Sequence, residues 1–154
     1  MKTLVIIRHA KAETAFTLND FDRSLNDRGK ADAPMMAKRL HKKIKIDAFV
    51  SSPAKRTKKT VEFFAEAYGI NEKNITYVSA LYHAPPSVFS DVVSALDDSL
   101  NNVAIVAHNP GITIFANELT TDAELDNMPT CSVFAVQAEV DNWSDFGKAK
   151  KKFL

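Results

Sequence analysis

The chain has 154 residues, 45% of them apolar, and its 20 basic side chains nearly balance 19 acidic ones, which gives a formal net charge of +1. This length suits one ordinary domain, residues 1–154, with a sizeable buried core. The balanced charge excludes an overall field that would attract nucleic acid or an anionic membrane, so any anion selectivity must be local.

Short apolar runs alternate with helical patterns through the first half of the chain. Residues 3–7 are continuously apolar and rich in β-branched side chains, which predicts a strand buried on both faces. A helical pattern over 26–40 follows, with Asn26 as its cap. Residues 48–50 predict a second strand, and a helix over 52–69 follows it, with Ser52 as the predicted cap and a proline in its first turn.

The second half repeats this alternation. Residues 75–78 and 103–107 predict strands, and prolines mark the starts of helices over 86–96 and 110–119. The last stretch has no long helical pattern, so we predict two closing strands there, within 131–140 and 143–153, that can pair antiparallel. Alternating strands and helices predict an α/β domain with a largely parallel sheet.

Targeting and membrane signals are missing from the sequence. The apolar run before Arg8 is too short for a signal peptide, and no stretch approaches the roughly 18 unbroken apolar residues of a membrane span. Cys131 is the only cysteine, which excludes an internal disulfide framework and is typical of a reducing compartment. We therefore expect a cytoplasmic monomer.

Chemically active side chains follow the predicted strands at their carboxyl ends, where open α/β sheets bind ligands. Arg8 and His9 follow the first strand, Arg56 comes shortly after the second, His83 follows the third and His108 the fourth. Two guanidinium groups on one rim can clamp a phosphoryl group, and a neutral histidine beside them can act as a nucleophile. The pattern predicts phosphoryl transfer through a covalent phosphohistidine at His9.

Three of these side chains also have a structural interpretation. His9 taken alone is typical of a hydrogen-bonded polar residue at a strand end. Arg56 belongs to the basic run KRTKK, which favours a solvated helix face, and His108 precedes an Asn-Pro turn signal. The functional interpretation depends on Arg8 being adjacent to His9 and on all four residues sharing one rim.

Four segments resemble the histidine phosphatase (phosphoglycerate mutase-like) superfamily, in the family's order and at suitable spacing. Arg8-His9-Ala10 resembles its Arg-His-Gly signature, and residues 51–60 are similar to its Ser-Pro-x-x-Arg-x-x-x-Thr block. Residues 107–112 are similar to its second histidine block, and residues 20–40 look like the corresponding segment of SixA-type phosphohistidine phosphatases. The resemblance spans nearly the whole chain.

The resemblance implies a three-layer αβα sandwich with a mixed, mostly parallel sheet. It also implies that His9 is the nucleophile, that Arg8 and Arg56 hold the phosphate, and that His108 stabilises the transition state. The full set of predicted substrate-binding residues is Arg8, Ser52, Arg56, His83, His108 and Asn109. No metal or organic cofactor is expected, and the sequence has neither metal-ligand spacing nor a Gly-rich nucleotide loop.

Two departures from the family pattern bear on the substrate. Ala10 replaces the signature glycine, although the SixA-like branch often carries alanine there. Many family members place a glutamate as general acid after the third strand, where this sequence reads SALYHAPPS. His83, Asp20 and Asp22 stay open as substitute acids. Imidazole is a weaker base than an alkoxide and needs less help to leave, so a site without a carboxylic acid favours phosphohistidine substrates.

The sequence therefore predicts a phosphohistidine phosphatase that acts on a phosphorylated protein, such as a phosphotransfer domain. A general phosphatase acting on small phosphorylated substrates, including phosphate esters, is the second hypothesis. The third is a catalytically silent module that binds a phosphoprotein through the same pocket. No nucleic-acid or membrane partner is expected.

Overall fold

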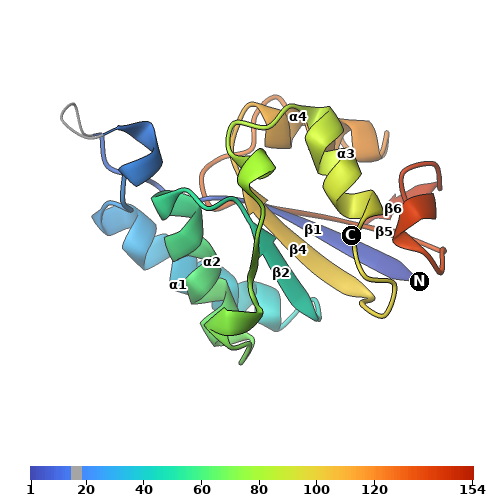
Figure 1. Cartoon of the computed structure of the whole chain (residues 1–154), viewed down its shortest axis with the longest axis horizontal. Coiled ribbons are helices and arrows are strands. Elements are labelled where there is room, and N and C mark those ends of the chain that lie inside the picture. Colours follow the sequence, from blue (N-terminus) through green and yellow to red (C-terminus); the bar gives the residue numbers. More distant parts are fainter. Residues whose placement is uncertain (15–18) are drawn as a thin grey trace.

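The computed structural model describes residues 1–14 and 19–154, which form a mixed six-stranded sheet with helices on both faces (Figure 1). The strand order is β3-β2-β4-β1-β5-β6, so the first and fourth strands are central. The strands are β1 (Lys2–Arg8), β2 (Ala48–Ser51), β3 (Thr76–Tyr77), β4 (Asn102–Ala107), β5 (Val133–Ala138) and β6 (Lys151–Phe153).

The pairing confirms a mixed, mostly parallel sheet. β1, β2, β3 and β4 run parallel, whereas β5 pairs antiparallel with β1 and with β6. The parallel strands are joined by crossover segments, as expected for βαβ units. Their carboxyl ends consequently lie at the same edge of the sheet. The predicted rim residues are at or just beyond these ends.

The helices form the two outer layers of an αβα sandwich. They are α1 (Asp27–His41), α2 (Lys55–Ala67), α3 (Pro86–Ser94) and α4 (Gly111–Leu119). Leu4 and Ile6 of β1 pack in the core beneath α3 and α4, whereas Val5 and Ile7 pack beneath α1 and α2. Because both faces of β1 are covered, its continuous apolar run is required by the fold.

Several predicted boundaries are wrong, and one of these errors matters for the site. Asn26 caps α1 as predicted, by accepting from the amide of Gly29. Ser52 does not cap α2, which begins at Lys55 with Ala54 in the cap position. The Ser52 side chain is instead engaged by His108. Local sequence favoured a serine cap, but a tertiary contact takes the hydroxyl.

Two further differences lie at the sheet edges. The third strand is reduced to Thr76–Tyr77, and α3 ends at Ser94, before the predicted last residue of its pattern. The last predicted strand contains a short 3₁₀ helix, Trp143–Asp145, and pairs only over Lys151–Phe153. In the described part of the chain, no helix is both long enough and apolar enough to cross a membrane.

Candidate active site

Strand register places the two rim histidines side by side. Arg8 of β1 pairs with Ala107 of β4, so the residues that follow, His9 and His108, leave adjacent parallel strands at the same level. Their ring centroids lie 5.3 Å apart. The amide of His9 also donates to the carbonyl of Ala107 at 3.2 Å. The predicted convergence of these histidines therefore follows directly from the sheet.

The environment of His9 suits a nucleophile. His9 is 6% exposed, and its Nδ1 lies 2.8 Å from the carbonyl oxygen of Ala10, which can only accept a hydrogen bond. The proton is thus held on Nδ1, and Nε2 carries the lone pair. Burial, followed by the charges of Arg56 and Arg8, lowers the pKa of His9 to about 4 despite the bond to Ala10. His9 is neutral near pH 7.

The two arginines present unpaired donors. Arg56 lies in the first turn of α2 and is 2% exposed, and Arg8 ends β1 with Nη1 donating to the carbonyl of Met128 at 2.8 Å. In residues 1–14 and 19–154, three buried side-chain atoms lack a hydrogen-bond partner, namely Arg8 Nε, Arg56 Nε and His108 Nδ1. Burial, and next the charge of Arg56, lower the pKa of Arg8. Unpaired donors near other positive charges form a site that an anion would satisfy.

Ser52 sets the orientation of His108. The Ser52 hydroxyl lies 2.7 Å from Nε2 of His108, and both residues are buried. Burial, followed by the charge of Arg56, lowers the pKa of His108 to about 2, so its ring is neutral. If the serine hydroxyl donates to Nε2, then Nδ1 carries the proton, and this nitrogen has no hydrogen-bond partner among the described residues. Ser52 therefore lies behind His108, not on the pocket wall.

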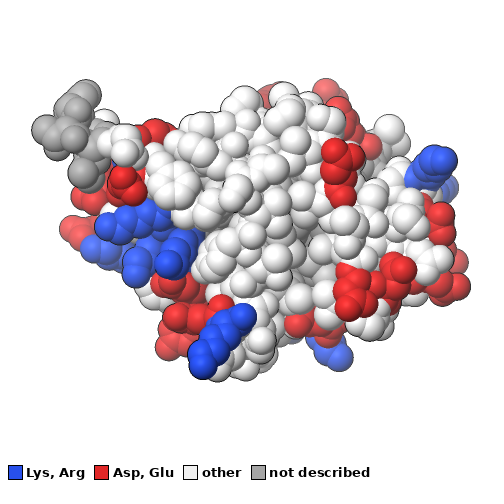
Figure 2. All heavy atoms as spheres, in the orientation of Figure 1, with Lys and Arg blue, Asp and Glu red and all other residues white. Residues whose placement is uncertain are grey.

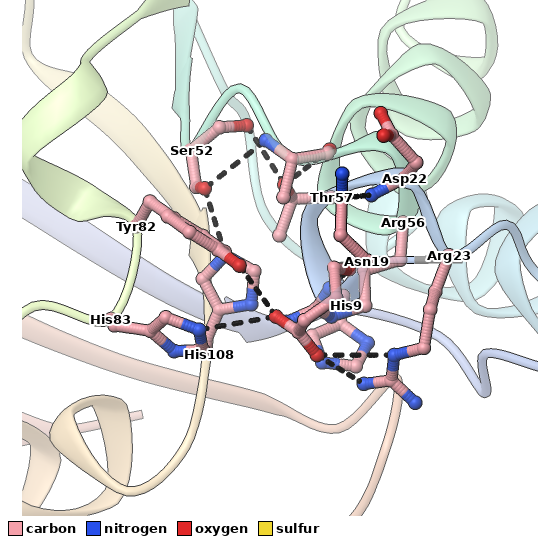
Figure 3. Close-up of polar contacts among 12 residues, drawn as sticks. His9, Asn19, Asp22, Arg23, Ser52, Arg56, Thr57, Tyr82, His83 and His108 are labelled. Atoms are coloured by element: carbon pink, nitrogen blue, oxygen red, sulfur yellow. Dashed lines mark hydrogen bonds and ion pairs between the residues drawn. The ribbon is translucent and has the colours of Figure 1, made fainter. Parts of the chain in front are cut away.

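These residues surround one small pocket. Its volume is about 240 Å³, below the roughly 300–1,000 Å³ of pockets that enclose drug-sized ligands. Figure 3 shows His9, Arg56, His83 and His108 pointing toward one another from different segments. The lining comprises Arg8, His9, Lys11, Ala12, Thr14, Asp20, Arg23, Arg56, His83, His108, Asn109 and Thr130. The pocket suits a phosphoryl group with a short part of its leaving group.

The structure separates the three candidate acids. Asp20 and His83 both line the pocket, and His83 Nε2 lies 3.1 Å from Asp20 Oδ2. Asp22 is exposed and does not belong to the pocket lining. Burial acts to raise the pKa of Asp20, but hydrogen bonds from Tyr82 and Arg56 outweigh it and lower that pKa well below its usual range. Asp20 is therefore a carboxylate and cannot donate a proton.

Asn109 reaches the pocket, but its amide is already engaged. It donates to Asn127 Oδ1 and to the carbonyl of Met128, and it accepts from the hydroxyl of Thr113. These bonds tie the turn after β4 to the segment that also receives Arg8 Nη1. Its predicted role in binding substrate remains a prediction, and its contacts indicate a role in holding the turn.

Polar residues outside the predicted set also belong to the site, and Tyr82, Arg23 and Lys11 are among them. Tyr82 donates its hydroxyl to Asp20 at 2.7 Å, and Arg23 binds the other oxygen of that carboxylate at 3.1 Å. Lys11 lines the pocket and is exposed. Tyr82 adjoins His83 in the sequence, which is the one local signal that pointed to it. Within the described ranges, no cluster of three His, Cys, Asp or Glu side chains is arranged to hold a metal ion.

Comparisons with known proteins identify a family and similar folds. The model of the histidine phosphatase superfamily (branch 1) matches residues 4–81. SixA of Agrobacterium tumefaciens, a candidate phosphohistidine phosphatase, is 25% identical with a TM-score of 0.77, and the match covers 88% of this chain and 91% of that one. SixA of Nakamurella multipartitia is also 25% identical, with a TM-score of 0.81 and coverages of 99% and 93%.

A third structure supports the fold alone. The protein histidine phosphatase SixA in complex with tungstate is 21% identical, has a TM-score of 0.82, and is matched over 99% of this chain and 94% of that one. A comparison with curated protein sequences finds no match. The family model spans half of the chain and includes Arg8, His9 and Arg56. The chain belongs to the histidine phosphatase superfamily and is a phosphatase.

Proposed function

We propose that this phosphatase hydrolyses protein phosphohistidine through a covalent phospho-His9 intermediate. The observation that carries the proposal is the set of unpaired polar atoms on Arg8, Arg56 and His108, which lie on residues lining one pocket with His9. Three such donors match the oxygens of a phosphoryl group. The free lone pair of His9 Nε2 then supplies the attacking atom.

The first step transfers the phosphoryl group to His9. Nε2 attacks phosphorus, and the bond from phosphorus to the substrate nitrogen breaks. A phosphohistidine ring protonated on its other nitrogen leaves as neutral imidazole, so this step needs no carboxylic acid in the site. Arg8, Arg56 and His108 stabilise the charge on the transferred group. Water then attacks phospho-His9, and phosphate leaves.

Pocket size and surface charge favour a protein substrate. A pocket of about 240 Å³ takes the phosphorylated side chain, while the rest of a protein remains outside. Basic side chains gather on the side of the molecule where α2 lies (Figure 2). On α2 itself, Lys55, Lys58 and Lys59 are exposed within one turn of Arg56. Such a surface raises the encounter rate with an acidic phosphoprotein. The similarity to SixA proteins supports the same substrate class.

The decisive experiment is to look for the intermediate. The chain is exposed to a phosphohistidine peptide, quenched, and analysed by intact-mass and peptide mass spectrometry at neutral and acidic pH. We expect an acid-labile phosphoryl group on His9. His9→Asn keeps a side-chain donor near the Ala10 carbonyl and should remove both the label and turnover. His41→Asn, a change at an exposed histidine of α1, is the matched control and should retain both.

Two outcomes would contradict the proposal. Turnover by the His9→Asn variant at a rate near that of the wild type would exclude His9 as the nucleophile. Binding of phosphate by the wild-type chain, with no label and no turnover of the phosphohistidine peptide, would favour a catalytically silent phosphoprotein-binding module.

A further inference from the structure

Asp20 gathers donors from segments far apart in the sequence. Its Oδ2 accepts from Arg56 Nη2 at 2.9 Å and from the Tyr82 hydroxyl at 2.7 Å, and lies 3.1 Å from His83 Nε2. Its Oδ1 accepts from Arg23, and its main-chain carbonyl accepts from Arg56 Nη1 at 2.7 Å. Figure 3 shows that Tyr82 and His83 enter the site from one side and Arg23 from the other. A carboxylate thus reaches the end of the third strand from the loop after the first.

The ionised state of Asp20 decides which group can carry a proton. An ionised carboxylate cannot donate a proton, but it can orient the neighbouring His83 ring, whose Nε2 lies 3.1 Å from Asp20 Oδ2. Because Nε2 faces the Asp20 carboxylate, Nδ1 is the nitrogen left to exchange protons with a substrate or with water. The arrangement matches the general pattern of a histidine oriented by a carboxylate.

The backbone holds His83 at the pocket in an uncommon conformation. Its φ angle is +53°, in the left-handed region that few residues other than glycine adopt. The next residue, Ala84, places its carbonyl against Gly111 at the start of α4, where a Cβ atom would clash. The Tyr82 ring packs on His83 with centroids 4.1 Å apart. These contacts fix the ring position, although the side chain is 54% exposed.

His9 and His83 lie at different depths in the same pocket. His9 is 6% exposed and forms part of the floor, whereas His83 is at the open side. His108 lies between them, with ring centroids 5.3 Å from His9 and 5.8 Å from His83. In-line displacement at phosphorus puts the nucleophile and the leaving group on opposite sides. A leaving group expelled by His9 therefore departs toward the side where His83 lies.

We propose that His83, oriented by Asp20, donates the proton to the leaving group, and that this pair extends the site to phosphate monoesters. The proposal rests on phospho-His9 as the intermediate. An ester leaves as an alkoxide unless it is protonated, and general acid catalysis is typically worth about 10²–10⁴-fold. His83 is then a catalytic residue, and Asp20 is a positioning residue that acts through it.

His83 gives up a proton in the first half-reaction and regains one in the second. In the first, His9 Nε2 attacks phosphorus, the P–O bond to the alcohol breaks, and the leaving oxygen takes a proton from the His83 imidazolium. In the second, neutral His83 removes a proton from water as its oxygen attacks phospho-His9. The P–N bond breaks, the lone pair returns to His9, and phosphate leaves. One ester and one water give one alcohol and one phosphate, and His83 is again protonated.

The test compares substrates that differ in leaving group. His83→Asn is suitable because asparagine tolerates positive φ. On glycerol phosphate, whose alkoxide needs a proton, we expect kcat/KM to fall about 10²-fold or more. On p-nitrophenyl phosphate, whose leaving group is stable as an anion, the fall should stay under about tenfold. Asp20→Asn should also lower kcat/KM for glycerol phosphate more than for p-nitrophenyl phosphate. A purely structural role of Asp20 would lower both values equally and leave their ratio unchanged.

Glycine at position 83 provides a second variant should the asparagine variant fold poorly. His83→Gly also fits the left-handed backbone, and imidazole added to the buffer should restore part of the glycerol phosphate rate. His41→Asn is again the surface control, with unchanged rates on both esters.

The possible failures can be told apart. Equal losses on both esters in the His83 variants, or a wild-type chain that turns over p-nitrophenyl phosphate but not glycerol phosphate, would overturn this inference and leave phospho-His9 standing. A wild-type chain that forms no phospho-His9 with any of the substrates would overturn the proposed function and this inference with it.

Discussion

A cation with buried nitrogen atoms lies at each end of β1, and the two cations differ in how many hydrogen bonds the chain gives them. At the amino end, Lys2 is 2% exposed. Its ammonium group donates to the carbonyl oxygens of Asp98 and Leu100 and, at 3.0 Å, to Asn101 Oδ1. An ammonium group has three N–H donors, so Lys2 is fully satisfied by the protein. This is a structural cation that fastens β1 to the loop before β4.

Arg8 at the carboxyl end is left incomplete. Nη1 donates to Met128, but Nε is buried without a partner, as is Nε of Arg56 nearby. A buried polar group without a hydrogen bond costs about 1–3 kcal/mol. The chain supplies three acceptors to the ammonium group of Lys2, so the missing acceptors at Arg8 are specific to that end of the strand. The unpaired donors at this end therefore indicate where a ligand contributes what the chain does not.

The largest expected effect comes from removing the incomplete cation. Arg8→Ala should lower kcat/KM for a phosphohistidine substrate by about 10²–10³-fold, because it removes a donor to the charge that develops on the phosphoryl group. The free energy of unfolding should change little, since few bonds within the chain are lost. Steady-state kinetics and urea unfolding measure the two quantities. Arg28→Ala, a change at an exposed arginine of α1, is the control. An Arg8 variant with near-normal kinetics would contradict the comparison.

Lys2→Met should show the reverse pattern. Methionine keeps the apolar stem but leaves three acceptors without their donor, so we expect a loss of about 3 kcal/mol in the free energy of unfolding. Activity of the folded fraction should stay close to that of the wild type, because Lys2 lies at the opposite end of the strand from His9. Lys45→Met, on a side chain that is 82% exposed, should leave both quantities unchanged. Lost activity at full stability would show that the amino end is not merely structural.

How much of the site was predictable depends on how each residue is positioned. Arg8 ends a buried strand, and His9 and His108 directly follow buried strands, which are marked in the sequence by continuous apolar runs. Once the strands are parallel and adjacent, their carboxyl ends coincide, so the rim followed from local pattern and topology. Arg56 was found in the same way, because it lies in the first turn of the helix after β2.

Contacts between loops could not be predicted in this way. Asp20 meets Tyr82 across 62 positions of the sequence, and nothing in either segment indicates the other. Their meeting depends on packing elsewhere, including the close approach of Ala84 to Gly111. The same holds for Ser52, whose local pattern predicted a helix cap although its hydroxyl binds His108. Where a side chain has several possible hydrogen-bond partners, the tertiary structure decides which partner it takes.

Acid titration tests a further property of the carboxyl end of β1, which lies beside buried neutral imidazoles. The pKa of His9 is lowered from about 6.5 in the unfolded chain to about 4 in the fold. Below pH 6.5 the unfolded chain binds a proton that the folded chain excludes, so this contribution to stability is complete above pH 6.5 and is lost as the pH falls toward 4. At pH 5 the loss from His9 should be about 2 kcal/mol.

Urea unfolding at pH 7 and pH 5 measures this loss. His9→Asn cannot titrate, so its stability should fall by about 2 kcal/mol less than that of the wild type between these two pH values. Phosphate bound to the folded chain favours protonated histidine and would mask the effect, so both series are recorded in a buffer without phosphate. Equal losses in the two proteins would show that His9 is not buried as a neutral base.

The smallest expected effect comes from Ser52, which contacts His108 but does not line the pocket. Ser52→Ala removes the hydroxyl next to His108 Nε2, which leaves the ring free to carry its proton on either nitrogen. We expect kcat/KM to fall by about five- to tenfold, near the 1 kcal/mol of one neutral hydrogen bond, with KM for substrate little changed. Nuclear magnetic resonance of the His108 ring nitrogens should show a shift toward the Nε2–H tautomer. Ser87→Ala on the exposed face of α3 is the control. An unchanged tautomer in the Ser52 variant would mean that the surrounding charges, and not the hydroxyl, orient His108 for the transferred phosphoryl group.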